Sequence, residues 1–518
     1  MKIDYEARKF LVVDDFAGFR SMLRGMLQML GAKHIDDASN AARAVEKIAK
    51  NNYDVILCDY NLGSGQDGQG VLEEAKFRGL VGYTTVFVMI TAENTMKMVM
   101  GAVEYKPDDY LTKPFNKGLL KKRLDNIISK KSDLGKILRA ADRGEYKKAV
   151  INCDKEMVEH PKMALEIAKI KGEVCIRADQ YNLAEQVYEK VLSIKPLVWA
   201  RLGMGKVKYY KGEYDNAIEI LQVLVNENKL LVEAYDLLSM ALNKRGDSES
   251  AQTVLMNAVE LSPKAILRHK QLGRLAYDNG DLVASETALK SAVKLGKTSY
   301  LRNPKDHFAL SKVLLEQKKA DEALQLIAET RKNFKKDENV QLETRILEAK
   351  AFQAKGSDDL AKRLFQDACK DFTSGAQEIP AHIVEDMVDI CSEFGENEMA
   401  DALKEALESG DETINLSTND ALANFEFLRM NMQGIECYGN DDLPQAIELF
   451  EKAAQKMPKH ISSNMNAAQA LLENMKEQGK KNKVVLKRVR KYLDRSKKVD
   501  SSNEKYQKLE IMYAQVVG

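Results

Sequence analysis

The sequence predicts an α/β region with a doubly wound, five-stranded parallel sheet over residues 1–130, followed by an all-α superhelical array of helical repeats over residues 131–518. Two observations support this prediction. Short apolar runs rich in β-branched residues alternate with amphipathic stretches in the first region, which is typical of alternating strands and helices. In the second region these runs disappear and small residues recur at a regular interval. A chain of 518 residues is also too long for one hydrophobic core.

The first region contains apolar runs that are short enough and apolar enough to be buried parallel strands. They cover residues 10–13, 55–58, 86–90 and 110–111, and a weaker run at 34–36 lies between the first two. Amphipathic stretches that predict helices cover residues 19–30, 41–50, 70–78, 95–103 and 119–128. Because strand and helix alternate five times, we predict a single sheet of flavodoxin-like type.

Charged and hydroxyl residues lie where these predicted strands end. Asp14 and Asp15 follow the first run, Asp59 closes the run at 55–58, Thr91 follows the run at 86–90, and Lys113 follows the last. The carboxyl ends of parallel strands line the crevice in which such sheets bind ligands. We therefore expect these side chains to meet at one site, with carboxylates at its centre.

Each of these residues also has an ordinary structural interpretation. Asp59 alone could be a turn or capping residue, and Thr91 could cap a helix that begins near Asn94. Lys113 and Pro114 could form a simple loop. Their joint occurrence, in order and at strand ends, favours a functional site over these separate interpretations.

The second region contains an internal repeat. Small anchor residues occur at Ala149, Ala184, Ala217, Ala251 and Ser285, which are 35, 33, 34 and 34 residues apart. This period is typical of a helix–turn–helix repeat of tetratricopeptide type. A small anchor allows two antiparallel helices to approach closely, glycines before the anchors permit tight turns, and prolines such as Pro263 end the second helices.

The repeat continues with lower regularity. Further anchors are expected at Ala323, Ala361 and Ala400, at spacings of 38 and 39 residues, and a clearer copy surrounds Ala446. We predict about nine repeats, with a capping helix near residues 484–499 that covers the last apolar face.

The overall composition argues against several functions. The 79 basic and 78 acidic residues give a net charge of +1, which offers no general case for binding nucleic acid or an acidic membrane. No apolar stretch is long enough to span a membrane, so no membrane insertion is expected. The six cysteines are scattered, which predicts reduced thiols in a cytoplasmic protein. A basic tract at 480–498 is expected to be a solvated helix face, with nucleic-acid binding as the less favoured alternative.

Taken together, Asp14, Asp15, Asp59, Thr91, Tyr110 and the Lys113–Pro114–Phe115 sequence make residues 6–130 resemble the receiver domain of bacterial two-component response regulators. The resemblance implies that Asp59 is the phosphoacceptor. It also implies that Asp14, Asp15, Asp59 and the backbone carbonyl of Asn61 hold Mg2+, a hard ion that prefers oxygen ligands. By the same resemblance, Lys113 and Thr91 contact the phosphoryl group. Tyr110 is the switch aromatic, although an ordinary half-buried strand residue would look the same.

The second region resembles tetratricopeptide repeats. The combination predicts a response regulator of a phosphorelay that is phosphorylated on Asp59 by a sensor histidine kinase or a phosphotransfer protein. Its repeats would bind an unknown protein, and the chain would not be an enzyme. One alternative is a phosphate sink or kinase modulator whose repeats bind the kinase. Another is a nucleic-acid-binding regulator that acts through the basic C-terminal helix.

Two features of the first region depart from a simple receiver pattern. Gly63 stands where proline is common in this family, which predicts a less rigid loop after Asp59. The predicted helix 95–103 carries more apolar residues, including three methionines, than one core-facing stripe needs. Either local core packing or docking on the repeats or on a second receiver, as in a homodimer, would account for this excess.

Overall fold

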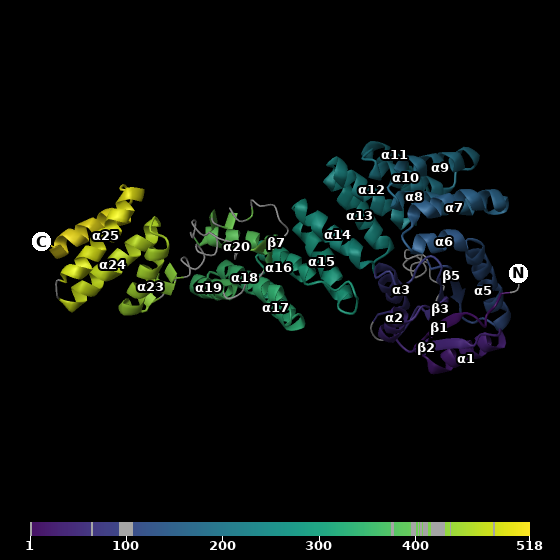
Figure 1. Ribbon diagram of the computed structural model, residues 1–518, viewed down its shortest axis with the longest axis horizontal. Helices are drawn as coiled ribbons and strands as arrows, with labels where there is room; N and C mark the ends of the chain where they lie inside the picture. The colour runs from purple at the N-terminus through teal and green to yellow at the C-terminus, as the bar shows by residue number, and fades with distance from the viewer. Residues whose placement is uncertain are drawn as a thin grey trace. The chain divides into compact units, whose positions relative to one another are not determined.

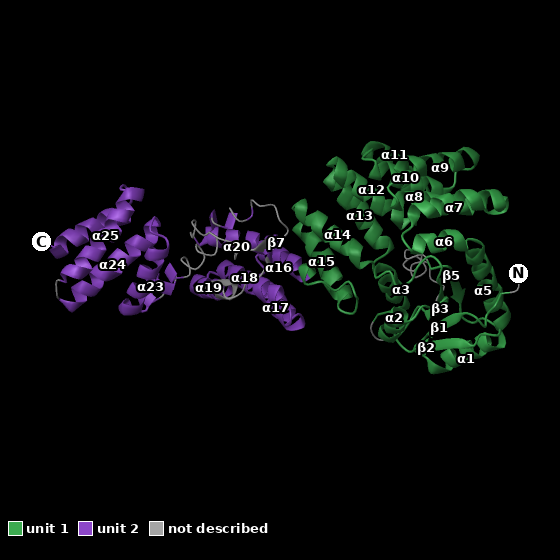
Figure 2. Ribbon diagram, viewed as in Figure 1, with its two compact units in different colours: residues 1–306 green, residues 307–518 purple. Residues whose placement is uncertain are grey.

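The computed structural model describes residues 3–63, 66–92, 107–373, 378–394, 400–401, 403–404, 407, 413–415, 430–431, 433–435, 437–479 and 482–517. The chain forms two compact units, residues 1–306 and residues 307–518 (Figure 2).

The N-terminal part of the first unit contains a five-stranded parallel sheet with strand order β2-β1-β3-β4-β5 (Figure 1). Its elements are β1 (Lys9–Val13), α1 (Ala17–Met29), β2 (His34–Ala38), α2 (Ala41–Lys50), β3 (Val55–Asp59), α3 (Gly68–Phe77), β4 (Val86–Thr91), β5 (Asp109–Thr112) and α5 (Lys117–Asp133). The predicted doubly wound α/β fold is therefore confirmed. The predicted helix over 95–103 lies outside the described residues.

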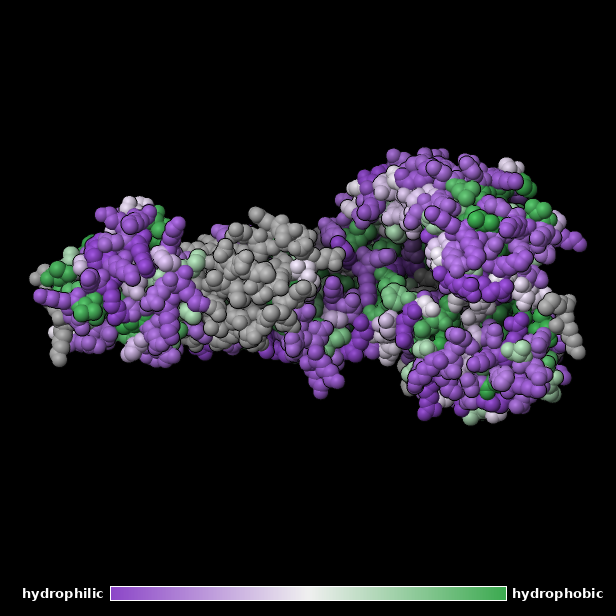
Figure 3. All heavy atoms as spheres, in the orientation of Figure 1, coloured by the Kyte–Doolittle hydropathy of each residue, from purple (hydrophilic) through white to green (hydrophobic). Residues whose placement is uncertain are grey.

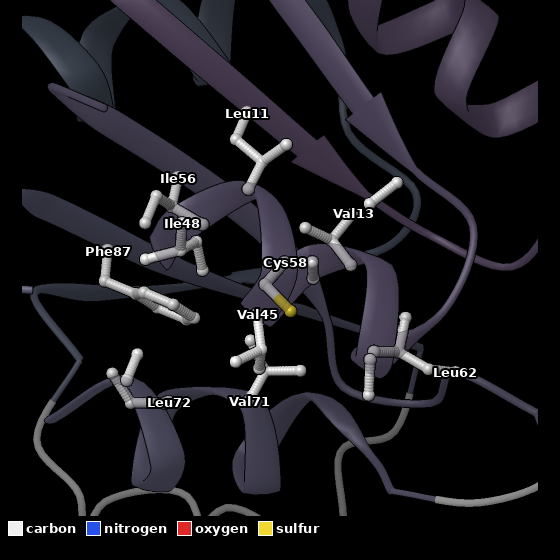
Figure 4. Packing of buried hydrophobic residues seen from close by; sticks show 14 of the residues in the cluster. Leu11, Val13, Val45, Ile48, Ile56, Cys58, Leu62, Val71, Leu72 and Phe87 are labelled. Atoms are coloured by element: carbon white, nitrogen blue, oxygen red, sulfur yellow. The ribbon is translucent and has the colours of Figure 1, made fainter. Parts of the chain in front are cut away.

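Helices cover both faces of this sheet because successive residues of each strand point to opposite faces. Leu11, Ile56 and Phe87 face one side, where they pack with Val45 of α2 and Val71 of α3 (Figure 4). The other side buries the alternate residues of the same strands against α1 and α5; this layer includes Phe10, Val12, Leu57, Ile90, Leu23, Leu27, Leu120 and Leu124. Burial on both faces explains why the strands are continuously apolar.

The strand register brings the strand ends to one edge of the sheet. Val13 pairs with Cys58, Asp59 pairs with Ile90, and Thr91 pairs with Thr112. The residues that follow β1, β3, β4 and β5 are therefore held beside one another at the carboxyl edge.

The rest of the first unit consists of antiparallel helices joined by short turns. They are α6 (Gly135–Asp142), α7 (Tyr146–Glu159), α8 (Ala164–Arg177), α9 (Tyr181–Ile194), α10 (Val198–Tyr210), α11 (Tyr214–Glu227), α12 (Val232–Arg245), α13 (Ser248–Leu261), α14 (Ile266–Asp278) and α15 (Leu282–Gly296). The five predicted anchors, Ala149 to Ser285, are fully buried. Gly144, Gly212, Gly246 and Gly280 take positive φ angles in the turns, and Asp179 takes one at the equivalent position of its repeat.

Large side chains fill the space left by glycines on neighbouring helices. The ring of Tyr188 packs directly against Gly172 and Gly203. A Cβ atom added to Gly172 would lie only 2.4 Å from this ring, and one added to Gly203 only 2.3 Å. Leu221 and Leu289 occupy the same kind of space beside Gly205 and Gly273. These close approaches show why the repeats need glycine within helices, where it otherwise destabilises.

The second unit continues the helical pairs. Its elements are α16 (Pro304–Glu316), in which the boundary between the units falls, α17 (Ala320–Asn333), α18 (Glu338–Ala354), α19 (Asp358–Thr373), α20 (Ala381–Glu393), α23 (Leu443–Lys456), α24 (Ile461–Gln478), α25 (Lys483–Val499) and α26 (Glu504–Val517). Ala323, Ala361, Ala400 and Ala446 are buried, as expected of anchors.

The second unit differs from the sequence prediction in one respect. The array is not entirely helical, because β6 (Glu378–Pro380) and β7 (Thr413–Asn415) form a small antiparallel sheet. Ile379 pairs with Ile414 and is buried in the hydrophobic core of this unit, which explains why a short polar-looking segment becomes a strand.

The hydropathy of the helices, the polarity of the surface and the burial of the cysteines can be compared with the sequence predictions. None of the described helices combines the length and the hydropathy that crossing a lipid bilayer requires. Figure 3 shows a mainly hydrophilic face on the first unit, with smaller hydrophobic areas among it. Cys58, Cys153 and Cys175 are buried free thiols, Cys391 is buried and Cys437 is partly buried.

Candidate functional site

Three carboxylates meet at the carboxyl edge of the sheet. One oxygen atom each of Asp14, Asp15 and Asp59 lies within 4.8 Å of the others. Asp14 and Asp59 are buried, whereas Asp15 is exposed, so the group opens to solvent on one side. The sequence predicted this meeting, because these residues end the two neighbouring strands β1 and β3.

Lys113 joins two of these carboxylates. Its Nζ atom lies 2.9 Å from Asp14 Oδ2 and 3.1 Å from Asp59 Oδ2. The same ammonium group lies 3.9 Å from the centroid of the Phe19 ring, within the range of a cation–π interaction. The backbone N–H of Lys113 donates to the carbonyl of Thr91, which fixes the lysine to the end of β4.

The electrostatics of the site disfavour ionisation of Asp59. The pKa of this carboxyl is raised from 3.8 to about 6: burial is the largest cause, Asp14 and Asp15 also raise it, and Lys113 lowers it. Burial and like charge both act against the ionised form. A divalent cation among the three carboxylates would remove much of this repulsion.

Local contacts that the sequence analysis did not identify hold the site in place. Arg20 Nη1 donates to the backbone carbonyls of Asp14 and Asp15, at 2.8 and 3.1 Å. Gly68, at the start of α3, lies so close to β3 that a Cβ atom would be 2.0 Å from the Asp59 carbonyl oxygen. The Arg20 contacts depend on how α1 is rotated, for which the sequence carries no clear signal.

Comparison with known proteins gives two family matches. Residues 10–125 match the response regulator receiver domain, and residues 232–264 match the tetratricopeptide repeat. This chain joins a receiver domain to tetratricopeptide repeats.

Three similar proteins each match about a quarter of this chain. The chain is 29% identical over 122 residues to chemotaxis protein CheY-3 of Vibrio cholerae, which covers 24% of this chain and 92% of that protein. It is 26% identical over 122 residues to chemotaxis protein CheY of Pseudomonas aeruginosa, covering 24% and 97% of the two chains. The solved structure of a two-component response regulator from Clostridium difficile is 31% identical over 24% of this chain and 96% of that chain, with a TM-score of 0.22.

Of the other predicted site residues of the receiver domain, Thr91 and Asn61 lie at the same edge of the sheet, and Tyr110 lies within β5. Thr91 is the last residue of β4 and is buried. Asn61 is exposed two residues after Asp59. Tyr110, in β5, is half-buried, and its hydroxyl group is enclosed without a hydrogen-bond partner among the residues that the structure describes. Burial raises the pKa of this phenol well above its usual value.

Residues 483–498 of the basic C-terminal tract lie in α25, whose arginines are engaged within the protein. Arg488 pairs with Glu451, and Arg490 pairs with Asp494 and Glu510 at 2.6 and 2.9 Å. Arg495 donates to the carbonyl of Ala454. These contacts reduce the positive charge available to a nucleic acid, in keeping with the solvated-face interpretation.

A second group of possible metal ligands occurs in the repeats, at Glu156, Glu159 and His160. Lys136 lies 3.0 Å from Glu156, so a cation of the protein already occupies this position. Within the described part of the chain, the group around Asp59 is the better candidate for a functional site.

Proposed function

We propose that this protein is a response regulator of a two-component phosphorelay, in which Asp59 accepts a phosphoryl group from a phosphohistidine. The donor would be a sensor histidine kinase or a phosphotransfer protein. The observation that carries this proposal is the buried carboxylate of Asp59, held within 4.8 Å of Asp14 and Asp15 and 3.1 Å from the Lys113 ammonium.

In the proposed transfer Asp59 is the only protein group that forms a covalent bond, and the other residues stabilise charge. An oxygen atom of Asp59 attacks the phosphorus, the P–N bond of the phosphohistidine breaks, and the imidazole leaves as its neutral form after taking up a proton. Only the ionised carboxylate can attack. Lys113 would stabilise the charge that the transferred oxygens carry, and the Thr91 hydroxyl would donate to one of them.

The three carboxylates suit a hard divalent cation. We propose that Asp14, Asp15, Asp59 and the carbonyl of Asn61 hold Mg2+, which keeps several waters and needs only a few protein oxygens. When bound, the ion neutralises the carboxylates and polarises the phosphoryl group. The fit rests on three carboxylates within 4.8 Å of one another, where burial first, and then the neighbouring Asp14 and Asp15, raise the pKa of Asp59 although Lys113 lowers it.

The output is proposed to be protein binding by the repeats, with a receiver over residues 1–130, about nine repeats over 131–518 and a capping helix near 484–499. Ion pairs link the first helices of successive repeats: Lys206 of α10 pairs with Glu233 of α12, and Arg268 of α14 pairs with Asp236 of α12. A bound segment would have to compete with these pairs, which favours a charged partner. We propose that the protein acts in the cytoplasm as an adaptor and not as an enzyme.

The experiment is affinity capture with the full chain. Wild type and Asp59→Asn are immobilised and incubated with acetyl phosphate, Mg2+ and cell extract, with Asp133→Asn as a control for loss of an exposed carboxylate. The proposal predicts a protein whose recovery differs between wild type and Asp59→Asn but not between wild type and Asp133→Asn. Equal recovery of every protein by all three chains would contradict a phosphorylation-dependent output.

A sensor kinase retained equally by all three chains would instead favour the alternative in which the repeats modulate the kinase. The charge pairs between the first helices of the repeats are compatible with either kind of partner.

A further inference from the structure

A lysine of the repeats lies against the loop that follows the Asp59 strand. Lys264 is in the turn between α13 and α14, and its Nζ atom lies 3.1 Å from Asp67 Oδ2. The same atom lies 5.4 Å from the centroid of the Tyr60 ring. Tyr60 and Asp67 are far from Lys264 in sequence, and both belong to the connection between β3 and α3.

Tyr60 and Asp67 are the first and last residues of this connection. The N–H of Gly68 donates to the Tyr60 carbonyl at 2.8 Å, and the N–H of Tyr60 donates to the carbonyl of Ile90 at 2.7 Å. Asp67 also caps α3, because its Oδ1 atom accepts from the N–H of Gly70 at 3.0 Å. Lys264 therefore contacts both ends of the connection, and uses the carboxylate oxygen of Asp67 that the cap leaves available.

The positions of Tyr60 and Asp67 affect the carboxylate site. Gly63 lies so close to Asp15 that a Cβ atom on it would be 3.2 Å from Asp15 Oδ2. Asn61, whose carbonyl is a proposed ligand of Mg2+, is bonded directly to Tyr60. A shift of Tyr60 or Asp67 would therefore move Asn61 and Gly63 relative to Asp15.

Two further groups of contacts attach the same side of the receiver to the repeats. At the end of α3, the ring of Phe77 lies 5.9 Å from that of Tyr300, and Arg78 lies 5.3 Å from the Tyr300 ring. In the loop after α3, Tyr83 and Thr84 donate backbone and hydroxyl hydrogen bonds to Asp142 of α6. The repeats thus contact the start of α3, its end and the loop that follows it.

In the part of the chain that the structure describes, the open side of the carboxylate site keeps its exposure to solvent. Asp15 and Asn61 are exposed, and Phe16 retains 70% of its possible exposure. A phosphodonor can therefore approach while the Lys264 contact is intact. This geometry favours a supporting role for Lys264 over a blocking one.

We propose that Lys264 is a positioning residue of the phosphoacceptor site, a cation that the repeat array supplies to hold the β3–α3 connection for Mg2+ binding and for phosphoryl transfer to Asp59. The proposal rests on the proposed function of Asp59. Under this proposal the repeats and the phosphoacceptor site are thermodynamically coupled. If the contact between Lys264 and Asp67 is stronger in the phosphorylated or in the unphosphorylated protein, it favours that form.

The expected size of the effect follows from the exposure of the pair. The side chains of Lys264 and Asp67 retain 49% and 28% of their possible exposure, so solvent screens their attraction. Exposed ion pairs of this kind change an equilibrium by about two- to fivefold. Loss of Lys264 should therefore weaken Mg2+ binding and slow phosphorylation by that factor, without abolishing either.

The test uses the full chain, four single variants and one double variant. Lys264→Ala removes the contact, and Lys264→Arg keeps a cation that can reach Asp67. Asp67→Asn removes the charge but keeps a good helix cap. Lys229→Ala is the matched control, because Lys229 occupies the equivalent turn, between α11 and α12, and is exposed. Calorimetry gives the Mg2+ dissociation constant, and intact mass spectrometry gives the initial rate of phosphorylation by acetyl phosphate.

We expect both quantities to worsen about two- to fivefold in Lys264→Ala, and to be restored in Lys264→Arg and unchanged in Lys229→Ala. Lys264→Ala combined with Asp67→Asn should be no worse than the poorer single variant, because both remove the same ion pair. Amide exchange at Tyr60 and Gly68 should become faster in Lys264→Ala. It should not change in Lys229→Ala.

Equal values for Lys264→Ala, Lys229→Ala and wild type would overturn the proposal, provided that wild type is phosphorylated. Faster phosphorylation of Lys264→Ala would also overturn it, because the lysine would then be hindering the site. If wild type itself gains no phosphoryl group, the proposed function of Asp59 fails. The Mg2+ dissociation constants and amide exchange would still decide whether Lys264 positions the connection.

Discussion

The ammonium group of Lys113 reaches the carboxylate of Asp59 across a whole strand of the sheet. Lys113 follows β5 and Asp59 ends β3, and β4 lies between these two strands. Their charged atoms are nevertheless 3.1 Å apart. The same lysine reaches Asp14, beyond β3 at the end of β1, at 2.9 Å. One cation thus pairs with carboxylates at the ends of two strands. Its removal should change the electrostatic environment of both Asp14 and Asp59.

Lys113→Met should raise the pKa of Asp59 above its value of about 6, because Lys113 is the main influence that lowers it. Loss of a close opposite charge moves a carboxyl pKa by about one unit or more. The measurement is a carbon NMR titration of the aspartate carboxyl groups in metal-free buffer. Lys117→Met is the control, because Lys117 is exposed nearby in α5. An unchanged Asp59 titration would show that Lys113 does not pair with it in solution.

Asp59→Asn should stabilise the metal-free receiver at neutral pH. The pKa of Asp59 is raised from 3.8 to about 6, so the folded state binds this proton more tightly than the unfolded chain does. Stability from this group is therefore lost as pH rises from about 4 to 6, and it stays lower above that window. The asparagine variant should gain about 1–3 kcal/mol at pH 7.5 and nothing near pH 4.

Hydrogen exchange of β3 amides measures this difference locally, as is needed in a chain of several units. Asp133→Asn, which changes an exposed carboxylate at the end of α5, should show no such dependence on pH. A destabilised Asp59→Asn at neutral pH would mean that the carboxylate is better stabilised than its burial indicates.

Tyr110→Phe should leave the stability of the receiver unchanged or raise it by up to about 1 kcal/mol. The Tyr110 hydroxyl is enclosed and has no hydrogen-bond partner among the described residues, so its removal relieves a desolvation cost without breaking a bond. The free energy of opening is read from hydrogen exchange of β5 amides. A loss of more than 1 kcal/mol would indicate that the hydroxyl forms a hydrogen bond in solution.

Gly68→Ala should disrupt the site from the backbone side. The added Cβ atom would lie 2.0 Å from the Asp59 carbonyl oxygen, so α3 or β3 must move, at a cost of about 3 kcal/mol or more. Gly25→Ala is a suitable control, because nothing lies within 4 Å of its added Cβ atom in α1; this variant should be as stable as wild type or slightly more stable. Thermal unfolding and Mg2+ calorimetry compare the two, and equal Mg2+ affinity would mean that β3 and α3 separate freely.

The strands and the central residues of the site were predictable because their signals are local. Continuous apolar runs identify buried parallel strands, and their carboxyl ends must share an edge, which brings Asp14, Asp59, Thr91 and Lys113 together. The repeat was predictable because its small anchors face a neighbouring helix in each copy.

Other contacts depend on tertiary packing that no local pattern encodes. Arg20 reaches the carbonyls of Asp14 and Asp15 only through the orientation of α1. Lys264 meets Asp67 only because the repeats fold back on the receiver. Ile379 enters a strand because the core of its unit buries it, although its flanking residues favour a loop.

The central claim is that Asp59 is the phosphoacceptor, and intact mass spectrometry of the full chain tests it most directly. Wild type and Asp59→Asn are incubated with acetyl phosphate, with Mg2+ or with EDTA. The account predicts a mass increase of one phosphoryl group in wild type with Mg2+ alone, removed by hydroxylamine, and none in Asp59→Asn. An equal increase in both proteins, or none in wild type, would contradict it.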